Sequence, residues 1–329
     1  MKIPKYIIWI IAAVIILFFL YLAQIYLPSS SNKEDEAFLV QKGDSVSEIA
    51  QNLKEQGLIR NVLLFKGYVW ITGHSADLKS GRYVFNPRIS LANIVRMISL
   101  GDTQGLEITI IEGWNKYDIG DYLQGKDIVT KNDFLKELNN SFDLEILKDK
   151  PNDVDLDGYL FPDTYKLGDD FSAQAIIKKA VLNLDKKLDD NLRQEIAKQG
   201  KSIFEIITIA SLIEKEGKTR SDKDIISGIL WKRLKSGMPL QLCATINYIT
   251  GKKTLTIQQE ELSIDSPYNT YLYPGLPIGP ISNPGMESIL AAIYPKESKY
   301  WYYLSAPDGT MVFSKTLKEH DVARAKYLK

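Results

Sequence analysis

The sequence predicts an α+β protein in which a single N-terminal transmembrane helix precedes a small α+β region and a larger mixed α+β region. Three observations lead to this prediction. An uncharged apolar run occupies residues 6–27, a strand–turn–helix pattern then recurs within a hundred residues, and helical patterns alternate with Pro/Gly-rich loops in the remainder. With 329 residues, of which 45% are hydrophobic, the chain is long enough to bury more than one core.

The composition excludes several classes of chemistry. Forty-one basic and 41 acidic residues cancel, so we expect no nucleic-acid partner. The single cysteine, Cys243, and the two histidines, His74 and His320, lie far apart in sequence, which makes a zinc site or a Ser-His-Asp triad improbable. We therefore expect neither a metal nor a cofactor. Carboxylate chemistry remains, and it favours glycosidic bonds as the substrate.

The apolar run at residues 6–27 is predicted to cross a membrane, because its 22 residues match a hydrocarbon layer of about 30 Å. Lys2 and Lys5 precede the run, and a mostly acidic segment follows it. The positive-inside rule then places residues 1–5 in the cytoplasm, with 28–37 as a linker and the rest outside, in a single-pass protein of the cell membrane. The alternative, a cleaved signal peptide, is disfavoured by the length of the run and by the lack of an A-x-A-like site.

A strand, a Gly turn and a helix recur within residues 38–125. The two clearer copies are residues 40–53 (VQKGDSVSEIAQNL) and 110–123 (IIEGWNKYDIGDYL), and residues 84–98 form a looser third copy. The first copy resembles a LysM-like unit, a compact βααβ module associated with glycans that contain N-acetylglucosamine. The resemblance rests on the K-G-D-S turn and the I-A-x-x-L helix. The alternative is a generic strand–turn–helix spacer.

Residues 126–329 form the larger predicted region. Helical patterns at residues 171–198, 223–236 and 286–294 carry apolar faces that suit a packed domain. Near the chain end, apolar strand patterns at residues 300–305 and 311–314 flank a Pro-Asp-Gly turn, which predicts a β-hairpin.

Two loops of unusual composition interrupt this region. Residues 156–165 (LDGYLFPDTY) combine aromatic rings with Asp157 and Asp163, which suits either a sugar-binding wall or a loop packed on its own side chains. Residues 266–285 contain five prolines and three glycines, which exclude a helix and a central strand. That stiff loop either holds its tyrosines and Asn269 in fixed positions or forms an extended surface segment.

The helical pattern at residues 206–217 (IITIASLIEKEG) contains the principal candidate for catalysis, Glu214. Its neighbours one turn away are small residues, Ala210, Ser211 and Gly217. A carboxylate between small residues and beside an apolar stripe can face a ligand, in surroundings whose poor solvation raises its pKa. Glu216 points away from this face and is predicted to be solvated. The alternative for Glu214 is an ordinary surface glutamate.

In this order, the motifs resemble those of the endolytic murein transglycosylases of the MltG (YceG-like) family, membrane-anchored enzymes that cut nascent peptidoglycan. The matching motifs are ITIIEGW, LDGYLFPDTY, IASLIEKEG, SPYNTY with GLPIGPISNPG, and YYLSAPDGTMVFSKTLKEH, and together with the N-terminal run they cover most of the chain. The family's catalytic glutamate falls on Glu214. The chain departs from the family pattern at Asp157 (usually Glu), at Cys243 and Ala244 (usually Asp-Pro) and at Met311 (usually His).

The resemblance implies an enzyme, a lytic transglycosylase. Glu214 would protonate the oxygen between N-acetylmuramic acid and N-acetylglucosamine, then accept the proton of the C6 hydroxyl, giving a 1,6-anhydro end. Substrate-binding roles are expected for four further residues, Tyr165, Gln241, Asn269 and Tyr271. The expected partners are peptidoglycan glycan strands, the cell membrane and peptidoglycan synthases. Two alternatives stay open: a non-catalytic membrane-anchored peptidoglycan-binding scaffold, and a muramidase that uses water.

Overall fold

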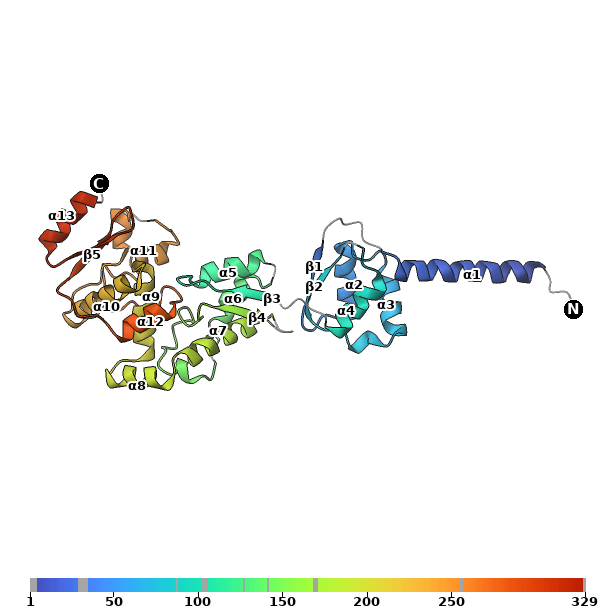
Figure 1. Ribbon diagram of the computed structural model, residues 1–329, viewed down its shortest axis with the longest axis horizontal. Helices are drawn as coiled ribbons and strands as arrows, with labels where there is room; N and C mark the ends of the chain where they lie inside the picture. Colours follow the sequence, from blue (N-terminus) through green and yellow to red (C-terminus); the bar gives the residue numbers. More distant parts are fainter. Residues whose placement is uncertain are drawn as a thin grey trace. The chain divides into compact units, whose positions relative to one another are not determined.

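The computed structural model describes residues 5–28, 35–86, 88–101, 106–126, 128–140, 142–167, 171–254 and 257–327 (Figure 1). The chain divides into two compact units. Unit 1 comprises Met1–Ile108 and Lys166–Phe171, and unit 2 comprises Thr109–Tyr165 and Ser172–Lys329. Most of the predicted linker and most of the predicted cytoplasmic N-terminus lie outside the described residues. The predicted region boundaries at 38, 125 and 126 stay a prediction.

The prediction of a transmembrane helix is corrected by the structure. Within the part of the chain that the structure describes, no helix combines the length and the apolar character needed to cross a membrane. The apolar run does form a helix, α1 (Lys5–Tyr26). However, its C-terminal end belongs to the packed core of unit 1: Ile25 is only 2% exposed, α1 contacts α4 (Leu91–Leu100), and Pro28 forms an antiparallel bridge with Ser90.

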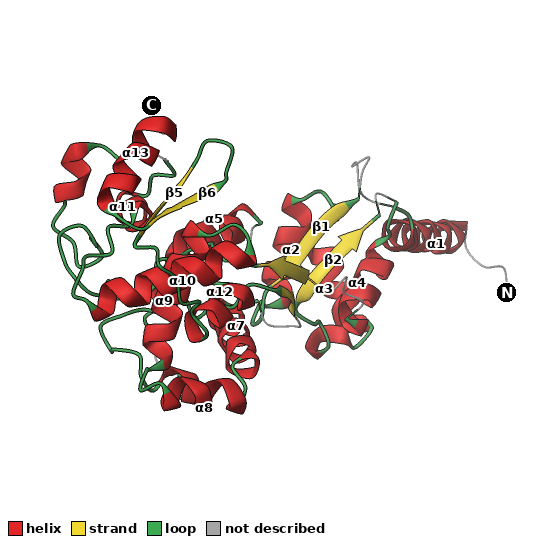
Figure 2. Cartoon of the chain, turned by 60° about the vertical axis from the view of Figure 1, so that its left-hand side comes forward, coloured by secondary structure: helices red, strands yellow, loops and turns green. Residues whose placement is uncertain are grey.

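Unit 1 is built from a two-stranded antiparallel sheet and the helices that pack on it (Figure 2). Strand β1 (Glu36–Val40) pairs with β2 (Gly81–Phe85), with Phe38 opposite Tyr83. The elements between and after the strands are α2 (Val46–Glu55), α3 (Val62–Ile71), the short helix η1 (His74–Ala76) and α4 (Leu91–Leu100). The strand–helix–helix–strand order is the one that the LysM-like resemblance implies, and the LysM assignment itself stays a prediction.

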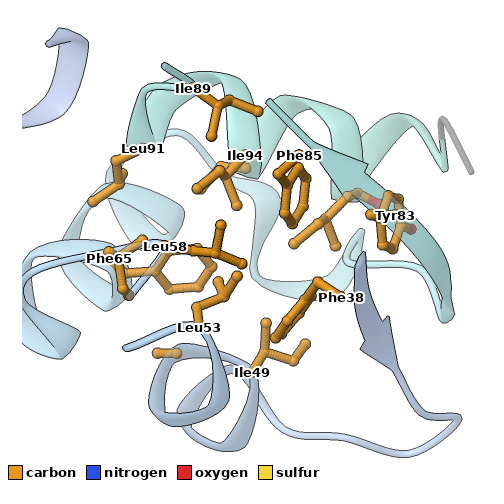
Figure 3. Close-up of a cluster of buried hydrophobic side chains, with 14 of the residues drawn as sticks. Phe38, Ile49, Leu53, Leu58, Phe65, Tyr83, Phe85, Ile89, Leu91 and Ile94 are labelled. Atoms are coloured by element: carbon orange, nitrogen blue, oxygen red, sulfur yellow. The ribbon is translucent and has the colours of Figure 1, made fainter. Parts of the chain in front are cut away.

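The core of unit 1 explains why these segments fold locally. Side chains that alternate along β1 and β2 point to the same face as the apolar stripes of the helices, so that Phe38, Leu53, Phe65, Phe85 and Ile94 meet in one buried cluster (Figure 3). Ser45 and Glu48 form a capping box at the start of α2, in which each side chain accepts a hydrogen bond from the other residue's backbone N–H, and the Asn61 and Ser90 side chains accept from backbone N–H groups at the starts of α3 and α4.

Unit 2 is mainly helical and contains the two-stranded sheet β5–β6, whereas the strands of the sheet β3–β4 each contribute residues to both units. The elements from β3 onward are β3 (Leu106–Thr109), α5 (Lys116–Gly125), α6 (Lys131–Glu137), η2 (Glu145–Leu147), β4 (Thr164–Leu167), α7 (Ala173–Lys187), α8 (Asp190–Lys198), α9 (Ile203–Glu216), α10 (Arg220–Lys235), α11 (Cys243–Thr250), η3 (Gln259–Ser263), α12 (Met286–Ile293), β5 (Tyr302–Ser305), β6 (Met311–Ser314) and α13 (Leu317–Tyr327). The predicted C-terminal hairpin is confirmed, with Tyr302 opposite Ser314.

The prediction of one helix over residues 171–198 is wrong. The backbone of Leu188 leaves the helical region at ψ 75°, which ends α7. Asp189 then adopts an extended conformation and caps α8 by accepting a hydrogen bond from the Leu192 N–H. The apolar periodicity continues across this break because both helices bury one face, and periodicity alone therefore did not reveal the boundary.

Helix α9 is the centre of unit 2 and packs against both α10 and α12. Its residues from Ile206 to Ile213 are all buried, because apolar side chains surround most of the helix. The helix begins at a capping box in which Ser202 and Glu205 satisfy each other's backbone N–H groups. The only part of α9 that carries charge beyond its first turn is therefore its last turn, where Glu214 lies.

Candidate functional site

Glu214 is held by hydrogen bonds on both oxygens. The Lys223 ammonium, from α10, donates to Oε1 at 3.1 Å. The Gly285 N–H and the Ser288 hydroxyl, at the start of α12, donate to Oε2 at 2.9 and 2.7 Å. The side chains of Glu214 and Lys223 are only 8% and 5% exposed. Glu214 is thus an enclosed carboxylate with one cationic and two neutral donors, and the surface-glutamate alternative does not describe it.

The α9–α10 connection brings Lys223 to Glu214. Gly217 ends α9, and Thr219 with Asp222 forms a capping box that starts α10 at once. A Cβ atom on Gly217 would lie 2.8 Å from the Cγ of Lys223. Glycine is therefore required at this position, because the Lys223 side chain must pass directly over the backbone to reach the carboxylate.

The loop before α12 is docked on the small-residue face of α9. The Ser211 hydroxyl accepts a hydrogen bond from the Ile281 N–H at 3.1 Å, and the Ser282 hydroxyl donates to the Ser211 carbonyl at 3.1 Å. Ser211 is buried. The small neighbours that the sequence placed on the Glu214 face therefore admit a protein loop, and this loop supplies the Gly285 N–H and the Ser288 hydroxyl.

A second carboxylate, Glu112, lies at the same site. A Cβ atom on Gly285 would lie 2.0 Å from Oε1 of Glu112, so the carboxylate rests directly on the Gly285 backbone. Burial raises the pKa of Glu112, the charge of Glu214 raises it further, and the Lys223 ammonium opposes both. The Gly113 carbonyl, next in the chain, accepts a hydrogen bond from Lys215 of α9 at 3.1 Å. The sequence motif ITIIEGW contained this residue, but its pattern gave no indication that Glu112 meets Glu214.

Asn283 joins the three loops around the site. Its Oδ1 accepts from the Gly158 and Leu160 N–H groups at 2.9 and 2.8 Å. Its Nδ2 donates to the Trp114 carbonyl at 3.0 Å and to Asp157 at 3.1 Å. Asn283 is fully buried, so every polar atom of its side chain is satisfied within the protein. The loops that carry Glu112 and Gly285 are consequently fixed to each other.

The sequence profile of the YceG-like family matches residues 38–326. The chain belongs to the YceG-like family. An endolytic murein transglycosylase of Bacillus subtilis is 35% identical over 302 residues, which cover 88% of this chain and 84% of that protein.

Two further proteins are similar to this YceG-like protein. An endolytic murein transglycosylase of Streptococcus pneumoniae is 29% identical, and the match covers 92% of this chain but 60% of that longer protein. The crystal structure of a yceG-like protein from Listeria monocytogenes superimposes with a TM-score of 0.62 at 33% identity, covering 88% of this chain and 99% of that one.

Three of the predicted substrate-binding residues of the YceG-like protein lie close together. The Gln241 N–H donates to the Thr270 carbonyl at 3.0 Å, which places its segment beside the loop of residues 266–285. The Tyr271 hydroxyl lies 3.2 Å from the Cys243 sulfur. Asn269 is fully buried, and its side chain bonds the Leu262 and Ile264 carbonyls and the Tyr271 N–H. Gln241 is exposed and Asn269 is internal to the loop.

Tyr165 lies elsewhere, in β4. Its hydroxyl donates to the Phe161 carbonyl at 2.5 Å and accepts from Asn183 at 3.1 Å, and burial raises its pKa to about 12. The neighbouring rings of Tyr159 and Phe161 are also buried. The aromatic side chains of residues 156–165 thus fill the interior of the protein, which favours the packed-loop alternative over an open sugar-binding wall.

Asp157 is a structural acid in this loop. It is 1% exposed and accepts hydrogen bonds from the Lys116 N–H at 3.0 Å and from the Tyr248 hydroxyl at 3.0 Å, besides Asn283. Burial and the nearby Asp155 raise its pKa to about 7. The oxygens of Asp157 accept hydrogen bonds from the loops around the Glu214 site. The aspartate is shorter than the family's usual glutamate, but it keeps a bonding role at this position.

The prediction that Glu216 is solvated is wrong. Burial raises the pKa of this carboxyl to about 7, and interactions with the Tyr303 phenol, the Ala244 backbone amide and the Arg233 guanidinium lower it only in part. The sequence placed Glu216 on the face opposite Glu214, as the helix requires, but the hairpin residue Tyr303 and helix α11 cover that face. Tyr271 and Cys243 also act electrostatically with Glu216.

The described residues contain no group of three histidine, cysteine, aspartate or glutamate side chains that could hold one metal ion. The chemistry that the site can perform with its own residues is proton transfer. Glu214 and Glu112 can accept or donate protons, while Lys223, Ser288 and the Gly285 N–H stabilise negative charge on Glu214.

Proposed function

We propose that this chain is an endolytic murein transglycosylase, which cleaves the bond between N-acetylmuramic acid and N-acetylglucosamine within peptidoglycan glycan strands and leaves a 1,6-anhydro end. Membership of the YceG-like family and the named relatives support the activity. The observation that carries the proposal is the enclosed Glu214 carboxylate, bonded to Lys223, Gly285 and Ser288 at the end of a buried helix.

Glu214 performs both proton transfers. In the substrate complex it carries the proton, which passes to the glycosidic oxygen as the bond from C1 to that oxygen breaks. The resulting carboxylate stabilises positive charge at C1 and accepts the proton of the C6 hydroxyl, whose oxygen bonds to C1. No water is consumed. The donors on Glu214 support this cycle because they orient the carboxylate and balance its charge after the first transfer.

The other predicted site residues take different roles in the proposal. Gln241 and Tyr271 contact the sugars, because Gln241 is exposed and the Tyr271 hydroxyl points to an exposed cysteine. Asn269 fixes the loop that carries Tyr271. Tyr165 supports the loop of residues 156–165 from within, since both bonds of its hydroxyl are internal.

Because glycan strands are assembled outside the cytoplasm, we expect unit 2, which contains Glu214, to lie there. Cleavage of un-crosslinked strands would terminate their elongation, so the synthases that extend these strands are the expected partners. This location and these partners are part of the proposal and follow from the substrate alone.

The test is digestion of un-crosslinked glycan strands by purified protein, with mass spectrometry of the new ends. Anhydro ends are expected. Reducing ends would identify a muramidase and overturn the transglycosylase assignment, and the absence of any new ends would favour a binding protein. The Glu214→Gln variant, purified in parallel, provides the background and shows that any cleavage belongs to this site.

Glycan binding by unit 1 is a second candidate function, and it is favoured by a hollow of about 260 Å³ at the predicted K-G-D-S turn. The hollow is lined by residues 40–44 and 78–80. Co-sedimentation of the Glu214→Gln variant with glycan strands would measure binding without cleavage. Lys42→Glu, in the hollow, should weaken binding at least threefold, whereas Lys54→Glu, exposed on α2, should not; equal binding by both would exclude the hollow.

A further inference from the structure

Glu112 and Glu214 approach the same residue, Gly285, from two sides. The Gly285 N–H donates to Oε2 of Glu214 at 2.9 Å. The Gly285 Cα faces Oε1 of Glu112 so closely that a Cβ atom would lie 2.0 Å from it. The backbone of Gly285, with φ −75°, would accept an alanine, so the glycine is required for space and not for conformation. The absence of a side chain at Gly285 therefore leaves the two carboxyl groups as neighbours.

The loop that carries Glu112 is held by hydrogen bonds at the two residues that follow it. The Gly113 N–H donates to the Asn283 carbonyl at 2.9 Å, and the Asn283 N–H donates to the Trp114 carbonyl at 2.7 Å. Lys215 bonds the Gly113 carbonyl from α9. These bonds to two other segments fix the backbone next to Glu112.

The charges around the pair do not balance. Glu112 faces Glu214 from α9, Glu287 from α12 and the Lys223 ammonium from α10. Lys223 bonds Oε1 of Glu214, at the oxygen that is not bonded by Gly285 and Ser288. One ammonium therefore faces three carboxyl groups, of which Glu214 is enclosed and Glu112 and Glu287 are exposed. Neighbouring like charges favour retention of one proton.

We propose that Glu112 is a second functional carboxylate of the site and that Glu112 and Glu214 hold one proton between them. This inference rests on the proposed function and adds the source of its proton. Glu112 carries the proton while Glu214 is paired with Lys223, and passes it to Glu214 before cleavage. Glu214 gives it to the glycosidic oxygen, takes one proton from the C6 hydroxyl and returns it to Glu112, so the proton count is unchanged after each turnover.

The first experiment is the pH profile of strand cleavage by Glu112→Gln. We expect kcat to fall at least tenfold with KM within threefold. The alkaline limb of the kcat profile should move to lower pH, because the neutral amide removes the like charge that favours retention of a proton in the pair. Glu287→Gln, which removes an exposed charge from the same surroundings, is the matched control and should stay within twofold of the unmodified protein.

A second experiment displaces Glu112 without removing it. In Gly285→Ala the new methyl group occupies the position of the Glu112 carboxylate, and kcat should fall at least tenfold. In the Glu112→Ala background the methyl group has space, so adding Gly285→Ala should change kcat by less than twofold. An equal loss in both backgrounds would mean that the methyl group acts on the Gly285 bond to Glu214, and would overturn the inference.

The outcomes separate the inference from the function on which it rests. If the unmodified protein produces no new ends, the transglycosylase assignment fails. If it cleaves and Glu112→Gln has the same rate and the same pH profile, the assignment stands and the second carboxylate is refuted. A Glu112→Gln loss without movement of the alkaline limb would indicate a role in shaping the loop and would equally refute the shared proton.

Discussion

Glu214 and Glu216 lie two residues apart on α9, and their carboxyl groups have different surroundings. Glu214 accepts hydrogen bonds from an ammonium, a backbone N–H and a hydroxyl. Glu216 faces Tyr303 of the C-terminal hairpin, and burial raises the pKa of Glu216 to about 7. The residue type and the helix are the same. The difference therefore comes from the segments that cover each face of the helix.

The two sets of surroundings suit two roles, proton transfer at Glu214 and packing of the domain at Glu216. Donors around Glu214 supply charge balance that a proton-transferring group needs at each step of its cycle. The cover over Glu216 disfavours a charge there, which suits a residue that packs the domain. Variants of the two acids and of their partners test whether the covering segments set this difference.

The largest difference is expected in activity between Glu214→Gln and Glu216→Gln. The amide at position 214 cannot donate a carboxyl proton, so the rate of strand cleavage should fall about 10³-fold. The amide at position 216 should leave the rate within about threefold. Counting new glycan ends per unit time measures both, and circular dichroism confirms that each variant is folded. A Glu216→Gln loss as large as that of Glu214→Gln would reverse the assignment of the two acids.

The next largest effect concerns the partner of Glu214. Lys223→Met keeps the length and the apolar stem of the side chain but removes the ammonium, leaving an enclosed carboxylate without its cation. Breaking a buried ion pair from one side costs about 3 kcal/mol of unfolding free energy. Chemical denaturation measures this cost. The double variant with Glu214→Gln should recover part of it, because the remaining partner is then neutral, and a lack of recovery would mean that the two groups are not coupled.

The variant Asn283→Ala tests whether the hydrogen bonds of Asn283 hold the loops around Glu214. The change removes four side-chain hydrogen bonds and leaves the buried Gly158 and Leu160 N–H groups without a partner. The expected loss is about 3 kcal/mol of unfolding free energy. Because these loops carry the partners of Glu214, cleavage should fall as well. Ser266→Ala, in an outer part of the same loop, should cost less than about 1 kcal/mol, and an equal cost would argue against a special role for Asn283.

The sequence predicted the local part of the Glu214 site and missed its long-range part. Apolar periodicity placed Glu214 on a buried helix beside small residues, because a helix face depends on spacing alone. Gly285 and Ser288 are more than 70 positions away in sequence and Glu112 is 102 positions away. No period or spacing links these positions to Glu214. The docking of the loop on Ser211 brings Gly285 and Ser288 there, and the bonds of Asn283 and Lys215 hold the loop that carries Glu112.

The same limit explains the error at Glu216. Glu216 was placed on the correct face, but the hairpin that covers this face comes from the far end of the chain. The role of Tyr165 stays a prediction, because aromatic composition does not reveal whether a ring packs inward. The C-terminal hairpin was predicted correctly because its two strands are adjacent in sequence and a Pro-Asp-Gly turn joins them.

The smallest effect is expected in the pH dependence of stability at Glu216. Its pKa rises from 4.5 to about 7 on folding, so between these values the folded state holds a proton that the unfolded state releases. The contribution of the Glu216 carboxyl to the free energy of unfolding is therefore fully present below pH 4.5 and is lost as the pH rises to about 7. Glu216→Gln has no proton to release and should gain about 2 kcal/mol relative to the unmodified protein at pH 8, with no gain at pH 4. Thermal unfolding of both proteins across this range measures the gain. A gain of the same size at both pH values would show that packing, and not the charge, sets the cost of Glu216.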